Sequence, residues 1–114
     1  MPNDKVPVPA QDLQVIKNYK PVLDLGRVVV ATPAVLAHLE KHAVFPAALL
    51  SRHQHGDWGN VDSEDAKSND QALLLGARVI SSYTVAYAVI WIVTEAVGEG
   101  GQRASTCLLF PEEY

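Results

Sequence analysis

The stretch "RVISSYTVAYAVIWIVTEA" (78–96) decides the fold class, because it is typical of two consecutive β-strands. β-branched and aromatic residues dominate it, and in each half, 78–86 and 87–96, successive side chains alternate between two sets. The two halves therefore predict a β-hairpin. A glycine-rich loop at 98–102 follows, and "RASTCLLFP" (103–111) predicts a third strand that ends at its proline.

The first half of the chain predicts helices, which begin at a proline or at a residue suited to an N-cap: 32–42, 45–56 and 60–76. The third helix is the best marked, with Asp62 as its N-cap and Gly76 as a left-handed C-cap. We expect Ala66, Leu73 and Ala77 to share its buried face, since they are spaced by seven and four residues.

These elements predict the α+β class. The expected architecture is a small antiparallel sheet, made of an N-terminal strand at 26–32 and three sequential C-terminal strands, packed against two or three helices. Residues 1–20 contain three prolines and predict an extended or mobile arm, with a short helical piece near Gln11–Asn18. Residues 21–114 are predicted to form a single domain.

Composition and charge exclude several classes of protein. The 114 residues carry a net charge of −4 and show no basic patch, which argues against a nucleic-acid partner. The longest apolar run, 83–93, is too short to span a bilayer, and the N-terminus lacks the apolar core of a signal peptide. Cys107 is the lone cysteine, which fits a reducing compartment. We therefore expect a cytoplasmic protein without a membrane partner and without a cofactor.

The stretch "LLSRHQHGDWGN" (49–60) gathers most of the side chains that could carry chemistry. We interpret it first as a helix end followed by a tight corner, in which Gly56 and Gly59 allow positive φ and cationic side chains meet the last carbonyls of the helix. His53 and His55 would lie in that last helical turn, where residues i and i+2 point roughly 200° apart. This geometry argues against joint ligation of a metal.

His38 and His42 offer a second possible metal pair, because residues four apart share one face of a helix. The glutamate that follows the first histidine in metalloprotease helices is absent, since residue 39 is leucine. The pair could join His53 or His55 if the two helices pack together. We nevertheless predict no metal site.

An enzymatic alternative, a small hydrolase or nuclease, remains open from the sequence. His53 would act as the general acid or base, because histidine suits proton transfer near neutral pH. Arg52 would hold an anion, and Asp57 or Glu95 would orient the imidazole of His53. The sequence supplies neither a clear nucleophile nor a set of metal ligands to complete this site.

From residue 26 to residue 114 the chain resembles short proteins encoded on plasmids, integrative elements and gene cassettes of proteobacteria. The matching stretches are "VVATP" (29–33), "LSRHQHGDWG" (50–59), "SSYTV" (81–85), "IWIVTEA" (90–96) and "TCLLFPEEY" (106–114). Within the RHxxGDWG motif the matching residues are Arg52, His53, Gly56, Asp57, Trp58 and Gly59, whereas His55 falls at a variable position. The hairpin turn "TVAYAV" departs from the Asp-Gly type of turn in these relatives, and the 98–102 loop is longer.

The resemblance implies no particular activity, and we expect a small binding or interaction protein carried on mobile DNA. It would self-associate as a homo-oligomer through the sheet or through the aromatic residues Trp58, Trp91 and Tyr83. A further hypothesis is an accessory of defence or counter-defence that binds a host protein. The acidic segment 57–70 would then contact a basic partner.

Overall fold

The structure is a computed structural model that describes residues 5–8 and 20–114, so the predicted helical piece near Gln11–Asn18 lies outside the described residues. Its elements are β1 (Val6–Pro7), β2 (Val28–Ala31), α2 (Pro33–Lys41), α3 (Pro46–Gln54), α4 (Ser63–Leu75), β3 (Val79–Val85), β4 (Ala88–Thr94), β5 (Ser105–Leu109) and the 3₁₀ helix η1 (Pro111–Glu113). The predicted α+β class is confirmed. No helix of the described part is both long and apolar enough to cross a membrane.

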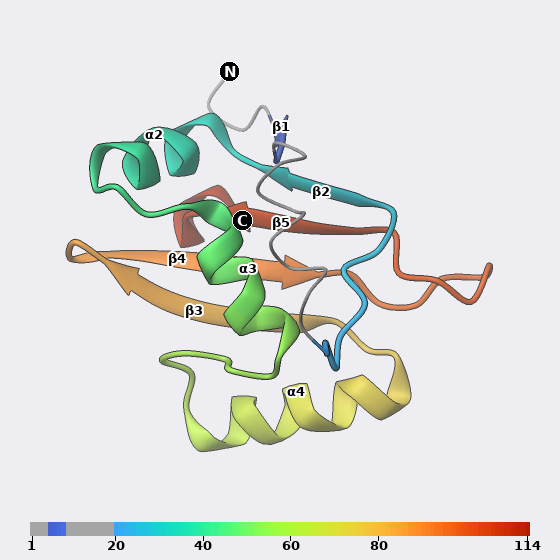
Figure 1. The fold of residues 1–114 in the computed structure, drawn as a ribbon. Helices are drawn as coiled ribbons and strands as arrows, with labels where there is room; N and C mark the ends of the chain where they lie inside the picture. Colours follow the sequence, from blue (N-terminus) through green and yellow to red (C-terminus); the bar gives the residue numbers. More distant parts are fainter. Residues whose placement is uncertain (1–4, 9–19) are drawn as a thin grey trace.

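The five strands form one sheet in the order β1-β2-β5-β4-β3 (Figure 1). All neighbours are antiparallel except β2 and β5, which run parallel with Val30 opposite Cys107. The predicted antiparallel sheet is therefore confirmed as a mostly antiparallel one, which contains a single parallel pair of strands. The chain leaves β2 through the helices and the β3–β4 hairpin and returns as β5, a connection long enough for parallel pairing. Within the predicted arm, Val6–Pro7 add a fifth strand and Val8 is buried.

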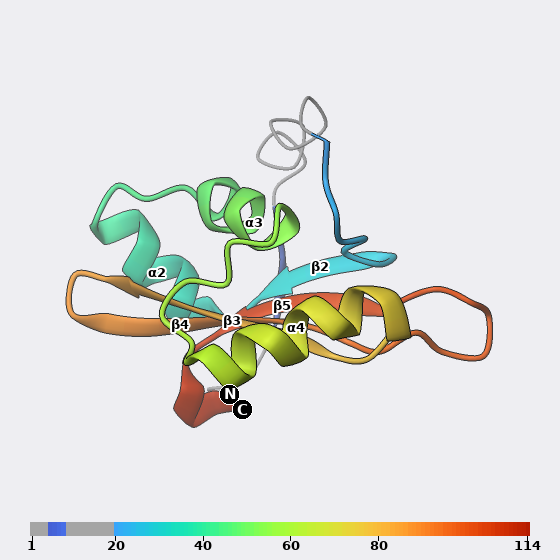
Figure 2. The same ribbon diagram turned by 90° about the horizontal axis from the view of Figure 1, so that it is seen from below.

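Helices α2 and α3 cover one face of the sheet, η1 lies on the opposite face, and α4 runs along the β3 edge (Figures 1 and 2). The main core lies under α2 and α3, and its buried residues are Val8, Leu25, Ala31, Val35, Leu39, Leu49, Leu50, Tyr83, Ile90, Ile92 and Leu108. A small cluster joins α4 to the sheet through Leu23, Trp58, Ala72 and Val79. The opposite face carries Val93, Cys107 and Leu109, flanked by Val30, Ile80 and Trp91.

Helix α4 has the predicted ends, and its buried face is the predicted one in part. The Asp62 side chain accepts a hydrogen bond from Asp65 N–H, and Gly76 has a φ of +76° at the C-cap. Asn69 and Ala72 are the buried residues of this helix, whereas Ala77 lies beyond it and is exposed. Ala66 and Leu73 are partly buried and pack against the small cluster, so the prediction was wrong only at Ala77. Because α4 lies along a sheet edge, only a narrow strip of the helix is covered.

The edge strand β3 is blocked at Ile80 and Ser82 by side-chain and main-chain groups that bind the outward-facing backbone of these two residues. The Asn69 amide donates to Ile80 O at 2.8 Å and accepts from Ile80 N at 3.2 Å. Ser82 N donates to Trp58 O at 3.0 Å, and Asn60 N donates to Ser82 O at 2.7 Å. These bonds occupy the positions at which a strand from another molecule would pair.

The predicted hairpin is confirmed: β3 ends at Val85 and β4 begins at Ala88. The two residues between them, Ala86 and Tyr87, have φ of +48° and +66°. Positive φ at both positions is the signature of a type I′ turn, which normally carries Asn-Gly. The geometry of the turn is therefore conventional, whereas its residues, Ala86 and Tyr87, are unusual for this type of turn.

Candidate functional site

The RHxxGDWG stretch ends α3 and turns the chain toward the edge of the sheet. Arg52 Nε donates to Asp57 Oδ2 at 2.6 Å, and Arg52 Nη2 donates to Asp57 Oδ1 at 3.3 Å. The same carboxylate accepts from Gly59 N at 3.1 Å. The hydrogen bond from Arg52 holds the pKa of the Asp57 carboxyl below its usual range. The Arg52 guanidinium also lies 4.6 Å from the centre of the Tyr83 ring.

His53 is fully buried, with an exposed fraction of 0%. Its Nδ1 lies 2.6 Å from Ser81 Oγ and its Nε2 lies 2.8 Å from Thr94 Oγ1. Burial, with a smaller effect of the Arg103 charge, lowers the pKa of His53 to about 3. His53 lies in the last turn of α3 as predicted, but the expectation that its ring meets the last helical carbonyls was wrong, because the ring points into the core.

The hydrogen bonds around His53 continue into a chain whose direction is fixed at its far end. Thr106 Oγ1 donates to Leu25 O at 2.7 Å, and a carbonyl can only accept. Thr106 Oγ1 lies 2.7 Å from Thr94 Oγ1, so Thr94 must donate to Thr106 and accept from His53 Nε2–H. Neutral His53 then accepts from Ser81 at Nδ1. We define Ser81, His53, Thr94 and Thr106 as the buried polar network.

The enzymatic arrangement that the sequence left open is not assembled. Neither proposed orienting carboxylate contacts His53, because Asp57 pairs with Arg52 and Glu95 pairs with Arg78 at 3.4 Å. Both ring nitrogens of His53 are already occupied by hydroxyl groups. A general acid or base must touch its substrate, and a ring with no exposed surface does not meet that condition.

The histidine pairs do not form a metal site either. The rings of His38 and His42 lie with their centres 4.6 Å apart, but His38 Nε2 is bound to Val85 O at 2.8 Å. Both ring nitrogens of His53 are hydrogen-bonded within the buried polar network. Within residues 5–8 and 20–114 no group of three or more histidine, cysteine, aspartate or glutamate side chains could hold a metal ion.

The three aromatic residues expected to mediate self-association differ in accessibility. Trp58 is 6% exposed and Tyr83 is 1% exposed. Trp58 Nε1 donates to Asp70 Oδ1 at 3.0 Å, and the Tyr83 hydroxyl donates to Asp57 O at 2.6 Å. Both side chains lie in the interior of the chain, so neither offers surface to a second molecule, and self-association itself stays a prediction. Trp91 is partly exposed and keeps access to a second molecule.

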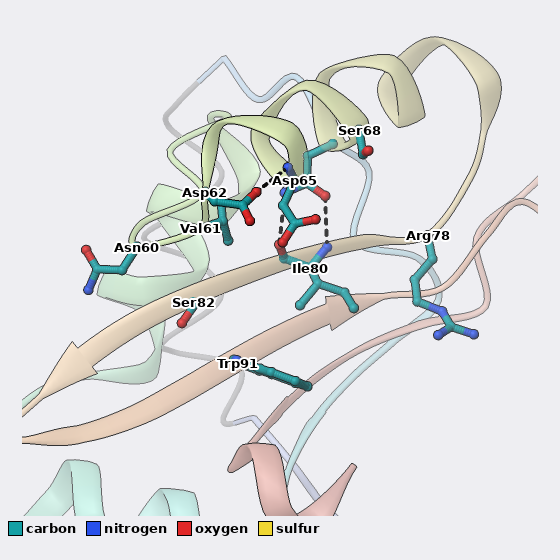
Figure 3. A pocket seen from close by; sticks show the side chains of 10 residues that line it. Asn60, Val61, Asp62, Asp65, Ser68, Arg78, Ile80, Ser82 and Trp91 are labelled. Carbon is teal, nitrogen blue, oxygen red and sulfur yellow. Dashed lines mark hydrogen bonds between the residues drawn. The ribbon is translucent and has the colours of Figure 1, made fainter.

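Trp91 lies in a groove of about 570 Å³ between the first turns of α4 and the sheet face opposite α2 and α3 (Figure 3). We call it the α4 groove; it is lined by Asn60, Val61, Asp62, Asp65, Ser68, Asn69, Arg78, Ile80, Ser82 and Trp91. Asp62 and Asp65 come from the start of α4, above Ile80 and Trp91. The Asp65 carboxylate makes no hydrogen bond or ion pair with another described side chain. Arg78 lies at one end of the α4 groove, where it forms an ion pair with Glu95 and contacts the Tyr114 ring.

Comparison of the chain with models of protein families, with curated proteins and with solved structures found no match.

The C-terminal stretch LLFPEEY (108–114), like the RHxxGDWG motif, joins separate parts of the fold. The Glu113 carboxylate accepts from Thr32 Oγ1 at 2.8 Å and from Phe110 N at 2.9 Å. The Thr32 oxygen in turn accepts from Val35 N and so caps α2. The end of the chain is thereby tied to the start of α2. The two motifs thus serve the folding of the described residues, and the α4 groove is a concave polar surface that lies outside both of them.

Sequence reasoning identified the acidic start of α4 and Trp91 separately but did not place them together. Asn60, Ser68 and Ser82 were not singled out for binding. No local signal marks them, because the α4 groove exists only where α4 packs along β3. The bond between Asn69 and Ile80 fixes that packing.

Proposed function

We propose that the protein is a small binding module whose α4 groove receives a basic segment of a partner protein. The observation that carries this proposal is one groove that has two carboxylates, Asp62 and Asp65, on its α4 side and the partly exposed Trp91 indole on its sheet side. A lysine or arginine side chain there gains a carboxylate partner and an aromatic face. Its aliphatic stem packs against Ile80.

The charge of the surrounding segment supports a cationic ligand. Over 56–70 the chain has five carboxylates and one lysine, namely Asp57, Asp62, Glu64, Asp65 and Asp70 against Lys67. Asp57 is neutralised by Arg52, and Asp70 accepts from Trp58. The remaining three carboxylates lie at the start of α4 and attract a basic partner over a distance comparable to the Debye length.

The polar side chains of the α4 groove suit an extended segment rather than a compact ion. Asn60, Ser68 and Ser82 lie along the lining and offer both donors and acceptors. Main-chain amides of a bound peptide can use these groups while its basic side chain reaches the carboxylates. The ligand class is therefore a basic peptide segment.

The test is a titration with a hexalysine peptide, followed by NMR of the backbone amides and of the Trp91 Nε1–H. We expect shifts confined to Asp62–Asn69, to Ile80 and Ser82, and to the Trp91 indole. Asp62→Asn keeps the N-cap, so Asp62→Asn and Asp65→Asn should each weaken binding by about three- to tenfold without unfolding α4.

Glu64→Gln is the matched control, since Glu64 lies in the same helical turn but does not line the α4 groove. It removes the same charge and should change the affinity less than the other two substitutions. A glutamate hexapeptide should cause no shifts. Equal weakening by all three substitutions, or shifts spread over other surfaces, would show that hexalysine binds by net charge alone.

The resemblance to proteins of mobile elements supports the proposal that the partner is a host protein, met in the cytoplasm during defence or counter-defence. The same proposal includes self-association as a homo-oligomer. Because Asn69 and Gly59–Asn60 block the β3 edge, self-association is not expected to proceed by strand pairing there. Exposed side chains outside the α4 groove are the better candidates.

A further inference from the structure

The β3–β4 turn holds a side chain in full contact with solvent at a conformational cost. Ala86 and Tyr87 both adopt positive φ, a region that residues with a Cβ rarely occupy. Tyr87 is also fully exposed. Asn-Gly would form the same turn with less strain. An unfavourable residue pair at an exposed turn points to a role for the side chain itself.

The turn is held in place by α2. His38 Nε2 donates to Val85 O at 2.8 Å, directly before the turn, and the Phe110 ring packs against His38 with 5.7 Å between the ring centres. Val85 packs against the main core. Tyr87 is therefore presented from a fixed base, which lowers the entropy that is lost when it binds.

The composition around Tyr87 favours burial in another molecule. The residues from Val85 to Val89 carry no charge, and Val89 is itself exposed. Because the turn carries no carboxylate, the net charge of −4 of a second copy does not repel it. Tyrosine is among the residues that dominate binding energy at protein interfaces.

A second groove of this chain has the complementary chemistry. It has a volume of about 410 Å³, lies between β1 and α2, and is lined by apolar side chains except for Glu40. Leu36, Val44 and the exposed Phe45 supply apolar surface to it. A phenol matches this lining, because its ring is apolar and its hydroxyl can donate to a single carboxylate. We call it the α2 groove.

The turn and the α2 groove lie at the same end of the molecule. In both views the β3–β4 turn and the α2–α3 connection, which supplies Val44 and Phe45, occupy this end (Figures 1 and 2). A two-fold axis at this end lets each copy offer its turn to the groove of the other, and the contact closes after two copies.

We infer that the protein forms a two-fold homodimer in which Tyr87 of each copy inserts into the α2 groove of the other copy. The inference rests on the self-association that is part of the proposed function. It does not depend on the α4 groove, which uses a different set of residues.

The experiment is sedimentation velocity of the full chain, beginning at a concentration on the order of 100 µM and diluting until any dimer dissociates. The decisive variant is Ala86→Asn with Tyr87→Gly, which removes the tyrosine and relieves the strain. We expect its Tm to rise by about 5 °C and its dimer to weaken at least tenfold. Loss of the dimer then has no explanation in misfolding.

Phe45→Ser, in the α2 groove, should also weaken the dimer, whereas the matched control Leu74→Asn should not. Leu74 is almost fully exposed but lies in neither the turn nor the α2 groove. Mixing the turn variant with Phe45→Ser should restore part of the association, because one of the two reciprocal contacts is intact in the mixed dimer.

A wild-type chain that sediments as a monomer at this concentration would contradict both the proposed self-association and the proposed contact of Tyr87 with the α2 groove. A wild-type dimer that survives the turn variant, or dissociates with Leu74→Asn, would keep the self-association but overturn the Tyr87 contact. Hexalysine binding at the α4 groove is measured separately, so failure of either proposal can be distinguished from failure of the other.

Discussion

At the scale of single residues, His53 is of a residue type that often acts in catalysis, but here it lies in the core and supports the fold. The direction of the buried polar network requires a proton on Nε2 and none on Nδ1. With a pKa of about 3, the ring stays neutral from pH 8 down to pH 5. Long-range ¹H–¹⁵N NMR of the imidazole should therefore show the Nε2–H tautomer without titration over this range. An imidazolium signal near pH 6 would contradict the assignment of the network.

The lowered pKa of His53 also predicts how the stability of the fold depends on pH. The pKa of His53 is lowered from 6.5 in the unfolded chain to about 3 in the folded one, so below pH 6.5 the unfolded chain binds the extra proton. The stabilisation is complete above pH 6.5 and is lost as the pH falls toward 3, by about 1.4 kcal/mol per pH unit. Urea unfolding at intervals between pH 7 and pH 5 should show this slope. A free energy of unfolding that stays constant from pH 6.5 to 5 would contradict it.

Gly59 occupies a position that no other residue fits. Its φ is +74°, and a Cβ built there would lie 2.0 Å from Ser82 O and 2.8 Å from Tyr83 Cδ1. Gly59→Ala should destabilise the fold by about 3 kcal/mol or more, because both the backbone and the edge strand must move. The control is Gly100→Ala, where a Cβ meets nothing within 4 Å and the change should stay within about 0.5 kcal/mol. Denaturant unfolding compares the two, and similar losses would contradict the steric argument.

At the scale of elements, the features predicted correctly are those set by neighbouring residues in the sequence. Thr32 and Asp62 cap their helices as expected, since capping depends on groups within one helical turn. The parallel pairing of β2 with β5 could not be predicted, because it depends on where a long connection returns. The burial of His53 depends likewise on Ser81 and Thr94, which are 28 and 41 residues away. The α4 groove belongs to the same category, because its sides come from separate elements.

The 3₁₀ helix η1 owes its position to one carboxylate, which gives a prediction for the C-terminal motif. Glu113 accepts from both Thr32 Oγ1 and Phe110 N, so Glu113→Ala leaves two partly buried donors without an acceptor. We expect a loss of about 1–3 kcal/mol in the free energy of unfolding. Glu112→Ala is the matched control, because Glu112 is exposed and neighbours Glu113. Thermal unfolding of both variants tests this, and equal melting temperatures would refute the role of Glu113.

At the scale of the whole molecule, the protection of the sheet edges decides whether the proposed dimer could form without open-ended assembly of strands. Strand β1 has two residues, one of them a proline that cannot donate to a further strand. Strand β3 is long, and its protection depends on contacts from α4 and from the corner after α3. A sheet with an exposed strand at its edge recruits strands from other molecules without limit, whereas a two-fold contact between side chains ends with two copies.

Asn69 is the residue on which this protection depends most, because its amide replaces a neighbouring strand at Ile80. Asn69→Leu keeps the size of the side chain but leaves the Ile80 N–H and carbonyl exposed at the edge. We expect a loss of about 1–3 kcal/mol in stability, together with aggregation that rises with concentration and binds thioflavin T. Asn60→Ala is the control, since its backbone bond to Ser82 O remains and only the side-chain bond to Thr84 is lost. Light scattering at equal fractions of folded protein compares the two variants. If Asn69→Leu scatters no more than Asn60→Ala, the edge is protected by something other than the Asn69 amide, and the packing of α4 along β3 serves stability alone.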